Sequence, residues 1–181
     1  MYYFYNTYVS TLRDSVLENL RKLLQIYSYF DVVFTGHSLG GAVAEHAALD
    51  AALSGLLTNG MSHKVNALIY TYGEPRIGNR VISDMVDDFF PGKYYRVTHN
   101  RDLVPHVPPC GPTLTSGCMT LSTIDDFYTP YHAGREIFYN EDSTSYVECD
   151  EGESPDCSDS LTWHLSIADH LEYLQMDFLC D

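Results

Sequence analysis

Apolar residues recur every three or four positions between residues 7 and 29, which is the spacing of an amphipathic helix. These apolar positions are Val9, Leu12, Val16, Leu20, Leu23, Leu24 and Tyr27. Charged side chains, among them Arg13, Asp14 and Glu18, fall on the opposite face. The pattern predicts a helix with one apolar face that packs on a sheet.

Further along the chain, short apolar runs rich in β-branched and aromatic residues alternate with helical patterns. We expect strands at 31–35, 67–72, 94–98 and 136–139, and helices at 7–29, 40–57, 79–90 and 167–174. Turn residues such as Gly, Pro and Asn separate most of these segments. Strands that alternate with helices predict an α/β fold with a mainly parallel sheet flanked by helices.

The most informative segment is a hydrophobic strand that runs into Gly36-His37-Ser38-Leu39-Gly40, followed by a helix rich in small residues. A strand, Gly-x-Ser-x-Gly and a helix in this order predict a nucleophile elbow. Ser38 is then expected in a strained turn that exposes its hydroxyl, with His37 pointing away from it. A side chain at Gly36 or Gly40 is expected to collide with the neighbouring backbone. The alternative is a glycine-rich turn with an exposed serine.

Composition narrows the classes of partner. The 181 residues carry 10 basic and 25 acidic side chains, for a formal net charge of −15. Because this charge repels nucleic acids and anionic membrane surfaces, neither is an expected partner. The chain contains no apolar run long enough to span a bilayer. We expect one domain over residues 1–181 and an uncharged substrate.

The amino-terminal residues do not resemble a secretory signal. They place four aromatic residues within the first five, which is unusual for the exposed start of a domain. We therefore expect that Met1 is an internal start and that the fold is truncated at its amino-terminal side.

Five cysteines indicate an oxidising compartment. Cys110 and Cys118 bracket one loop, Cys149 and Cys157 bracket another, and Cys180 is left over. Both spacings suit local disulfides, so we expect a secreted protein in which Cys180 pairs outside this chain. The alternative is a cytosolic protein with free thiols. No cysteine or histidine spacing is typical of a metal site.

An activated serine needs a histidine and a carboxylate, which follow the serine in the order Asp, then His, in α/β hydrolases. Asp102 comes directly after the strand at 94–98, at the sheet edge expected for Ser38. His170 follows the last predicted strand. The weaker alternatives are Asp125 and Asp126 for the acid and His132 and His164 for the base. Asp84, Asp87 and Asp88 are expected on a solvent-facing helix surface.

Four segments resemble the class 3 (fungal-type) lipases, whose fold is the α/β hydrolase fold. They are TGHSLGGA at 35–42, YGEPRIGN at 72–79, DLVPHVPP at 102–109 and ADHLEY at 168–173. The resemblance implies hydrolysis of carboxylic esters, mostly acylglycerols at a lipid–water interface, without a cofactor. It also implies that Ser38 is the nucleophile, Asp102 the acid and His170 the base, and that the backbone N–H of Leu39 is an oxyanion-hole donor.

The same resemblance implies what this chain lacks. Class 3 lipases begin with roughly a further third of the domain, which holds the first oxyanion-hole residue and the lid; the cysteine near their carboxyl end pairs with one in that part. The reading that follows is a secreted, monomeric triacylglycerol lipase. The alternatives are an esterase for feruloyl or other soluble esters, and a lipase-like binding or regulatory protein without catalysis.

Overall fold

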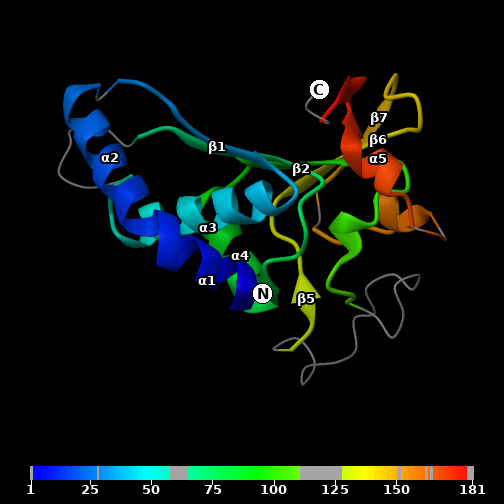
Figure 1. The fold of residues 1–181 in the computed structure, drawn as a ribbon, viewed down its shortest axis with the longest axis horizontal. Coiled ribbons are helices and arrows are strands. Elements are labelled where there is room, and N and C mark those ends of the chain that lie inside the picture. The colour runs from blue at the N-terminus through cyan, green and yellow to red at the C-terminus, as the bar shows by residue number, and fades with distance from the viewer. Residues whose placement is uncertain are drawn as a thin grey trace.

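The computed structural model describes residues 2–27, 29–57, 65–110, 128–150, 152–161, 163 and 165–178. Its centre is a five-stranded sheet in the order β1-β2-β4-β6-β7 (Figure 1). The strands are β1 (Val32–His37), β2 (Ala67–Tyr72), β4 (Tyr94–His99), β6 (Arg135–Tyr139) and β7 (Tyr146–Cys149). The first four are parallel and β7 is antiparallel to β6. The prediction of a mostly parallel α/β sheet is confirmed.

Helices connect these strands. The main ones are α1 (Tyr2–Thr7), α2 (Arg13–Ile26), α3 (Leu39–Leu53), α4 (Arg80–Phe89) and α5 (Ile167–Leu171). The helices α1 to α4 lie on the same side of β1 and β2, whereas α5 lies beside the end of the sheet near β6 and β7 (Figure 1). For α3 and α4, which connect β1 to β2 and β2 to β4, this follows because right-handed crossovers that move in one direction along a sheet cover the same face.

The first helix differs from the prediction in its limits and its packing. It begins at Tyr2 and ends at Ile26, and a π-helical segment, η1 (Tyr8–Leu12), separates α1 from α2. It packs mainly on α3, and its Leu17 and Leu24 share one hydrophobic core with the strand residues Phe34 and Ile69. The rings of Tyr5 and Tyr8 lie against His46 of α3, with centroid distances of 5.9 and 6.4 Å. These contacts to α3 explain why the helix starts among the aromatic residues.

Helix α3 is buried on most sides, and its small residues allow this. Ala42, Ala48 and Ala51 are fully buried, and they bring the helix close to the sheet residues Phe34 and Ile69. A helix that is apolar nearly all round is expected between two layers. It is therefore a rigid base for any residue at its amino-terminal end.

Short elements complete the described chain. They are two small antiparallel sheets, β3 (Gly78–Asn79) with β5 (Pro130–Tyr131) and β8 (Glu172–Tyr173) with β9 (Met176–Asp177), and two 3-10 turns, η2 (Val104–His106) and η3 (Ser158–Ser160). The prediction of a helix through residue 174 is wrong at its end, because the chain leaves α5 after Leu171 and forms the β8–β9 hairpin. The helix predicted at 40–57 likewise ends earlier, at Leu53.

A disulfide joins Cys149 at the end of β7 to Cys157, and Cys157 is completely buried. This pairing is confirmed. Cys118 and Cys180 lie outside the described residues, so their predicted pairings stay predictions. Among the described residues, no helix is long and apolar enough to cross a membrane.

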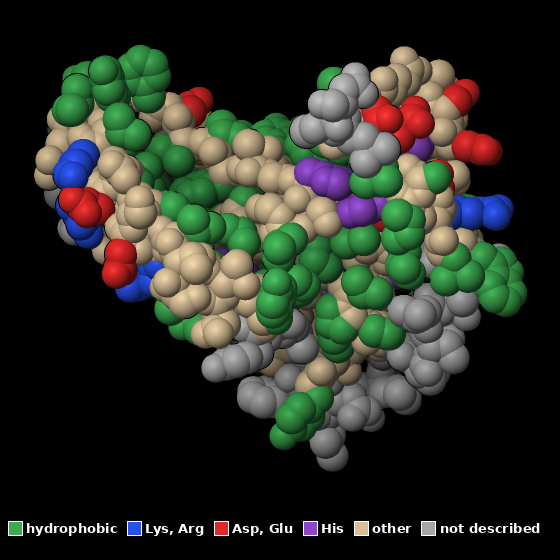
Figure 2. Space-filling view, viewed as in Figure 1, with side chains coloured by type: hydrophobic (Ala, Val, Ile, Leu, Met, Phe, Trp, Pro, Cys, Tyr) green, Lys and Arg blue, Asp and Glu red, His purple; other side chains and the backbone are tan. Residues whose placement is uncertain are grey.

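Hydrophobic side chains also reach the surface. Figure 2 shows them gathered over the end of α2 and along the neighbouring strand. The exposed members in this part of the chain are Leu23, Ile26, Tyr27, Tyr29, Phe30 and Val33. Within the described residues, β1 pairs only with β2, so its other edge forms the margin of the sheet.

Candidate active site

Ser38 occupies a sharp turn between β1, which ends at His37, and α3, which begins at Leu39. Its backbone has φ 56° and ψ −128°, a conformation that costs a non-glycine residue about 1–3 kcal/mol. A Cβ atom at Gly36 would lie 2.2 Å from the carbonyl oxygen of Gly40. The turn therefore closes only with glycine at position 36, and its strain presents the Ser38 side chain at the end of the sheet.

The expectation for Gly40 is wrong. A Cβ atom there would meet nothing within 4 Å. The crowded helix position is Gly41, where a Cβ atom would lie 3.1 Å from the Cβ of Glu74. The reason is helical geometry, since Gly41 faces the sheet and Gly40 faces away from it.

Ser38, His170 and Asp102 form a continuous series of hydrogen bonds, although 132 residues separate the first two in sequence. The Ser38 Oγ lies 2.8 Å from His170 Nε2, and His170 Nδ1 lies 2.8 Å from Asp102 Oδ2. Because a neutral imidazole has one donor nitrogen and one acceptor nitrogen, Nδ1 donates to the carboxylate and Nε2 is left to accept from the serine. This is the tautomer that a base for Ser38 requires.

Asp102 is almost fully buried, with 1% of its surface exposed. Its Oδ1 accepts the backbone N–H of Val104 at 2.8 Å, and its Oδ2 accepts the hydroxyl of Tyr173 at 2.6 Å as well as His170. Burial and Asp102 raise the pKa of Tyr173 well above its ordinary value, which keeps the phenol a donor. Three donors thus satisfy a carboxylate that would otherwise be costly to bury.

Helix α5 is held by hydrogen bonds at its amino-terminal cap and through the side chain of Asp169. The Ser166 hydroxyl caps it by accepting the N–H of Asp169 at 3.0 Å. The Asp169 carboxylate in turn accepts Asn100 Nδ2 and the Arg101 N–H, each at 3.0 Å. These bonds attach the segment that bears His170 to the segment that bears Asp102.

His37 lies against His170, a contact that its predicted orientation away from Ser38 does not reveal. Its ring is 4.5 Å from the His170 ring, and its Nε2 is 2.8 Å from the His170 carbonyl oxygen. The ring of Phe178 stacks on its other side at 4.2 Å. Burial lowers the pKa of His37, which favours its neutral form. The ring that packs against His170 is therefore an uncharged imidazole.

Gly73 is a second residue that the sequence patterns did not single out for this site. It has φ +57°, and a Cβ atom there would lie 2.8 Å from Asp102 Oδ2 and 2.9 Å from His170 Nδ1. The absence of a side chain therefore makes room for the Asp102–His170 hydrogen bond. A glycine that follows a strand is a common turn signal, so its sequence context alone does not reveal this role.

The remaining candidates lie elsewhere or outside the described residues. His132 is buried and its Nε2 is 2.8 Å from the carbonyl oxygen of Pro105, so its ring is used in a structural hydrogen bond. Asp84, Asp87 and Asp88 are exposed on α4, as predicted. Asp125, Asp126 and His164 lie outside the described residues. Within the described residues, no group of three or more His, Cys, Asp or Glu is arranged to hold a metal ion.

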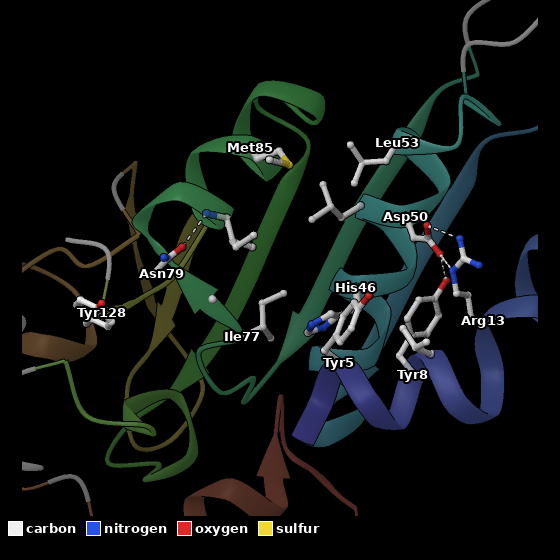
Figure 3. A pocket seen from close by; sticks show the side chains of 14 residues that line it. Tyr5, Tyr8, Arg13, His46, Asp50, Leu53, Ile77, Asn79, Met85 and Tyr128 are labelled. Carbon is white, nitrogen blue, oxygen red and sulfur yellow. Dashed lines mark hydrogen bonds and ion pairs between the residues drawn. The ribbon is translucent and has the colours of Figure 1, made fainter. Parts of the chain in front are cut away.

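A cavity of about 830 Å³ opens between α1, α3 and α4 (Figure 3). Leu53, Ile77 and Met85 give it apolar walls, while Asp50 is held at one end by Arg13 Nε at 2.7 Å and the Tyr8 hydroxyl at 3.1 Å. Ser38, Asp102 and His170 do not line it. The cavity is therefore separate from the serine site.

Comparisons with known proteins agree with this geometry. The family model described as "Lipase (class 3)" matches residues 1–111. The lipase of Rhizomucor miehei is 32% identical over 173 residues, covering 94% of this chain and 41% of that protein. Lipase ZK262.3 of Caenorhabditis elegans is 32% identical over 192 residues, covering 95% of this chain and 52% of that protein.

Solved structures of lipases also resemble this chain in their fold. The native Rhizomucor miehei lipase propeptide complex superposes with a TM-score of 0.77 at 31% identity, covering 98% of this chain and 51% of that chain. Lipase II from Rhizopus niveus superposes with a TM-score of 0.76 at 31% identity, covering 96% and 58%. This chain thus spans about half the length of these relatives.

Proposed function

Because the chain belongs to the class 3 lipase family, we propose that it hydrolyses carboxylic esters with Ser38 as the nucleophile. The observation that supports this most directly is the hydrogen-bonded series from Ser38 Oγ through His170 to Asp102, with both distances at 2.8 Å. An unassisted serine hydroxyl is a weak nucleophile, and this series supplies both the base and the group that orients it.

In the proposed reaction, Ser38 Oγ attacks the ester carbonyl carbon while His170 Nε2 takes the hydroxyl proton. His170 then gives that proton to the leaving alcohol, and an acyl-serine forms. His170 then takes a proton from a water molecule, whose oxygen attacks the acyl carbon. As the bond from the acyl carbon to Ser38 Oγ breaks and the acid leaves, His170 returns that proton to Ser38 Oγ. Asp102 stays ionised throughout and stabilises the imidazolium.

The oxyanion formed in each half-reaction needs donors, and we assign one of them to the backbone N–H of Leu39. Leu39 is the first residue of α3, and the first four N–H groups of a helix have no intrahelical acceptor. The positive end of the helix dipole adds to the same effect. Loss of one such donor typically costs about 10²–10³ in turnover.

For the substrate we propose acylglycerols, taken up at a lipid–water interface. Apolar side chains beside the reacting residues support this, since Leu39, Ile167 and Phe178 are 38%, 52% and 39% exposed. Figure 2 shows histidine side chains at the surface next to hydrophobic ones. A domain that acts outside the cell, which we propose to be monomeric, fits the Cys149–Cys157 disulfide in its compartment. It also fits the relative named "Secreted mono- and diacylglycerol lipase LIP4" of Malassezia restricta.

The test is labelling with a fluorophosphonate probe, combined with ester hydrolysis. The probe should modify Ser38 of the wild type, and Ser38→Ala should lose both labelling and hydrolysis. Retained hydrolysis by Ser38→Ala would overturn the assignment. A series of p-nitrophenyl esters, with and without an emulsified interface, separates substrate classes. Activity that rises with chain length and with the interface supports acylglycerols, whereas a preference for short soluble esters supports an esterase.

A further inference from the structure

Two buried carboxyl groups lie beneath the serine turn and take no part in the proposed reaction. Glu45 of α3 and Glu74, which follows β2, are each 2% exposed, and their carboxyl groups lie close enough to interact directly. A pair of ionised carboxylates at this depth would repel each other without water to screen them. The pair therefore needs a proton.

The hydrogen-bond partners of Glu74 indicate where that proton lies. Its Oε2 accepts the hydroxyl of Tyr94. Its Oε1 is buried and, like the buried Thr71 hydroxyl that faces Glu74, has no hydrogen-bond partner of ordinary geometry among the described residues. The Thr71 hydroxyl can donate one hydrogen bond to Glu74 but cannot bridge it to Glu45. A protonated Glu45 would supply the donor between the two carboxyl groups, and buried polar atoms are nearly always satisfied. In agreement, burial and the nearby Glu74 raise the pKa of Glu45 well above its usual value, and burial also raises that of Glu74.

The charged groups around the pair do not remove the need for this proton. From β4, Tyr94 and Arg96 face it. The Arg96 guanidinium is used elsewhere, since it donates to the carbonyl oxygens of Ala133 at 2.9 Å and Gly152 at 2.6 Å. It also lies 3.7 Å from Glu136 Oε2 of β6. One cation thus faces four carboxyl groups, those of Glu45, Glu74, Glu136 and Glu153. Asp87 of α4 also interacts with Arg96. It is acidic, so it supplies no cation that could neutralise the pair.

The position of Glu74 connects this pair to both halves of the serine site. On one side, its Cβ lies 3.1 Å from where a Cβ of Gly41 would be, in the first turn of α3 after Ser38. On the other side, a Cβ atom at its chain neighbour Gly73 would lie 2.8 Å from Asp102 Oδ2 and 2.9 Å from His170 Nδ1. Glu45 lies one turn beyond Gly41 on the same buried face of α3. A bond between Glu45 and Glu74 therefore holds the start of α3 against the segment that borders the base.

We propose that Glu45 and Glu74 share one proton, and that this bridged pair is a positioning device that sets Ser38 against His170. Removal of the proton at alkaline pH makes both carboxylates negative, separates α3 from the sheet and displaces the Ser38 hydroxyl. This inference rests on the proposed ester hydrolysis for its kinetic consequence, whereas the shared proton itself does not depend on catalysis.

The first test is infrared spectroscopy of the full chain at neutral pH, which detects a protonated carboxyl group by its C=O stretching band. The wild type should show this band, and Glu45→Gln and Glu74→Gln should each lose it. Because each variant removes the shared proton independently, one of them suffices if the other does not fold. The matched control is Glu18→Gln, which changes an exposed helical glutamate and should keep the band. A wild type without the band would overturn the proposal.

The second test is the pH profile of kcat and KM. In the wild type, kcat should fall at alkaline pH while KM changes less than twofold. Glu45→Gln keeps a hydrogen-bond donor that cannot ionise, so its alkaline limb should move up by about one pH unit or more. Glu45→Ala, which leaves Glu74 without its partner, should lower kcat about tenfold at neutral pH. Glu18→Gln should follow the wild type.

An alkaline limb that is the same in Glu45→Gln and the wild type would overturn the positioning role. A wild-type chain that shows the infrared band but hydrolyses no ester would overturn the proposed function and support the shared proton. The two failures are thereby distinguishable.

Discussion

The Tyr173 hydroxyl donates a 2.6 Å hydrogen bond to Asp102 Oδ2, the same oxygen that lies 2.8 Å from His170 Nδ1. Two donors therefore converge on one carboxylate oxygen. This arrangement fixes the orientation of the carboxylate independently of the histidine. The Tyr173 ring is itself enclosed by the rings of Tyr72, His99 and Phe178.

Substitution Tyr173→Phe removes this donor and keeps the ring. Because a hydrogen bond to a charged acceptor contributes about 1.5–3 kcal/mol, we expect kcat to fall about tenfold or more. KM should change little, since Tyr173 is buried and does not face the substrate. The control is Tyr146→Phe, at an exposed tyrosine. Equal kcat values for Tyr173→Phe and the wild type would contradict this role.

Substitution Gly73→Ala tests the space beside the Asp102–His170 bond. The new methyl group would lie within 3 Å of both side chains, and a displacement of about 1 Å in such a site can cost about 10²-fold in rate. We expect a loss of kcat of about that size, measured with a soluble ester.

The matched control for this change is Gly92→Ala. Gly92 also has a positive φ, +66°, but a Cβ atom there meets nothing within 4 Å. Both variants therefore bear similar backbone strain, and only Gly73→Ala adds the collision. If the two variants lose activity equally, strain and not the collision is responsible.

The buried His132 predicts a loss of stability in acid. Burial, with Arg96 and Arg76 nearby, holds the pKa of His132 well below 6.5, so the unfolded chain binds a proton that the folded chain does not. Stability is therefore complete above pH 6.5 and falls as the pH drops toward the folded pKa. One such group contributes a slope of up to about 1.4 kcal/mol per pH unit.

Urea unfolding between pH 7 and pH 5 measures this slope. His132→Gln keeps a donor for the Pro105 carbonyl but cannot bind the proton, so its stability should depend less on pH than that of the wild type. An unchanged slope would assign the acid sensitivity to other groups.

The Cys149–Cys157 disulfide closes a short loop, with a sequence separation of 8. By the chain-entropy relation, such a loop stabilises the fold by about 2.5 kcal/mol. We expect the double variant Cys149→Ala/Cys157→Ala to lose about this much in urea unfolding. A reducing agent should destabilise the wild type but have a smaller effect on the double variant. A change below about 0.5 kcal/mol would show that the loop is held by its other bonds.

Much of the fold could be predicted from local patterns. The strand at 67–72 has the predicted limits because its side chains alternate between buried and half-buried positions. Helix α4 begins one residue after the predicted start because Asn79 caps it by accepting the N–H of Ile82. The β8–β9 hairpin was missed because Leu174 and Gln175 adopt positive φ values of 55° and 62°, without the Gly or Asn that ordinarily signals such a turn.

The candidate site could be predicted only in part. Chain order within an α/β hydrolase indicates the segments of Asp102 and His170, and the structure brings both to Ser38. The contacts of Tyr173 and His37 could not be predicted, because they join residues 71 and 133 positions apart and depend on the final packing. For Gly40 and Gly41, the sequence did not reveal which of the two faces the sheet.

The loop closed by Cys149 and Cys157 contains Glu153, whose carboxylate binds Arg76 twice at 2.7 Å and also accepts the His132 N–H at 3.0 Å. Arg76 in turn donates to the Val107 and Pro108 carbonyl oxygens, a few residues beyond Asp102. An engineer who transplanted only the serine turn and its two partners to another scaffold would leave this support behind. A transplant that keeps these contacts must therefore include the loop of Glu153, which lies some fifty residues after Asp102. Shortening that loop would remove the bonds that hold Arg76 and would weaken the site.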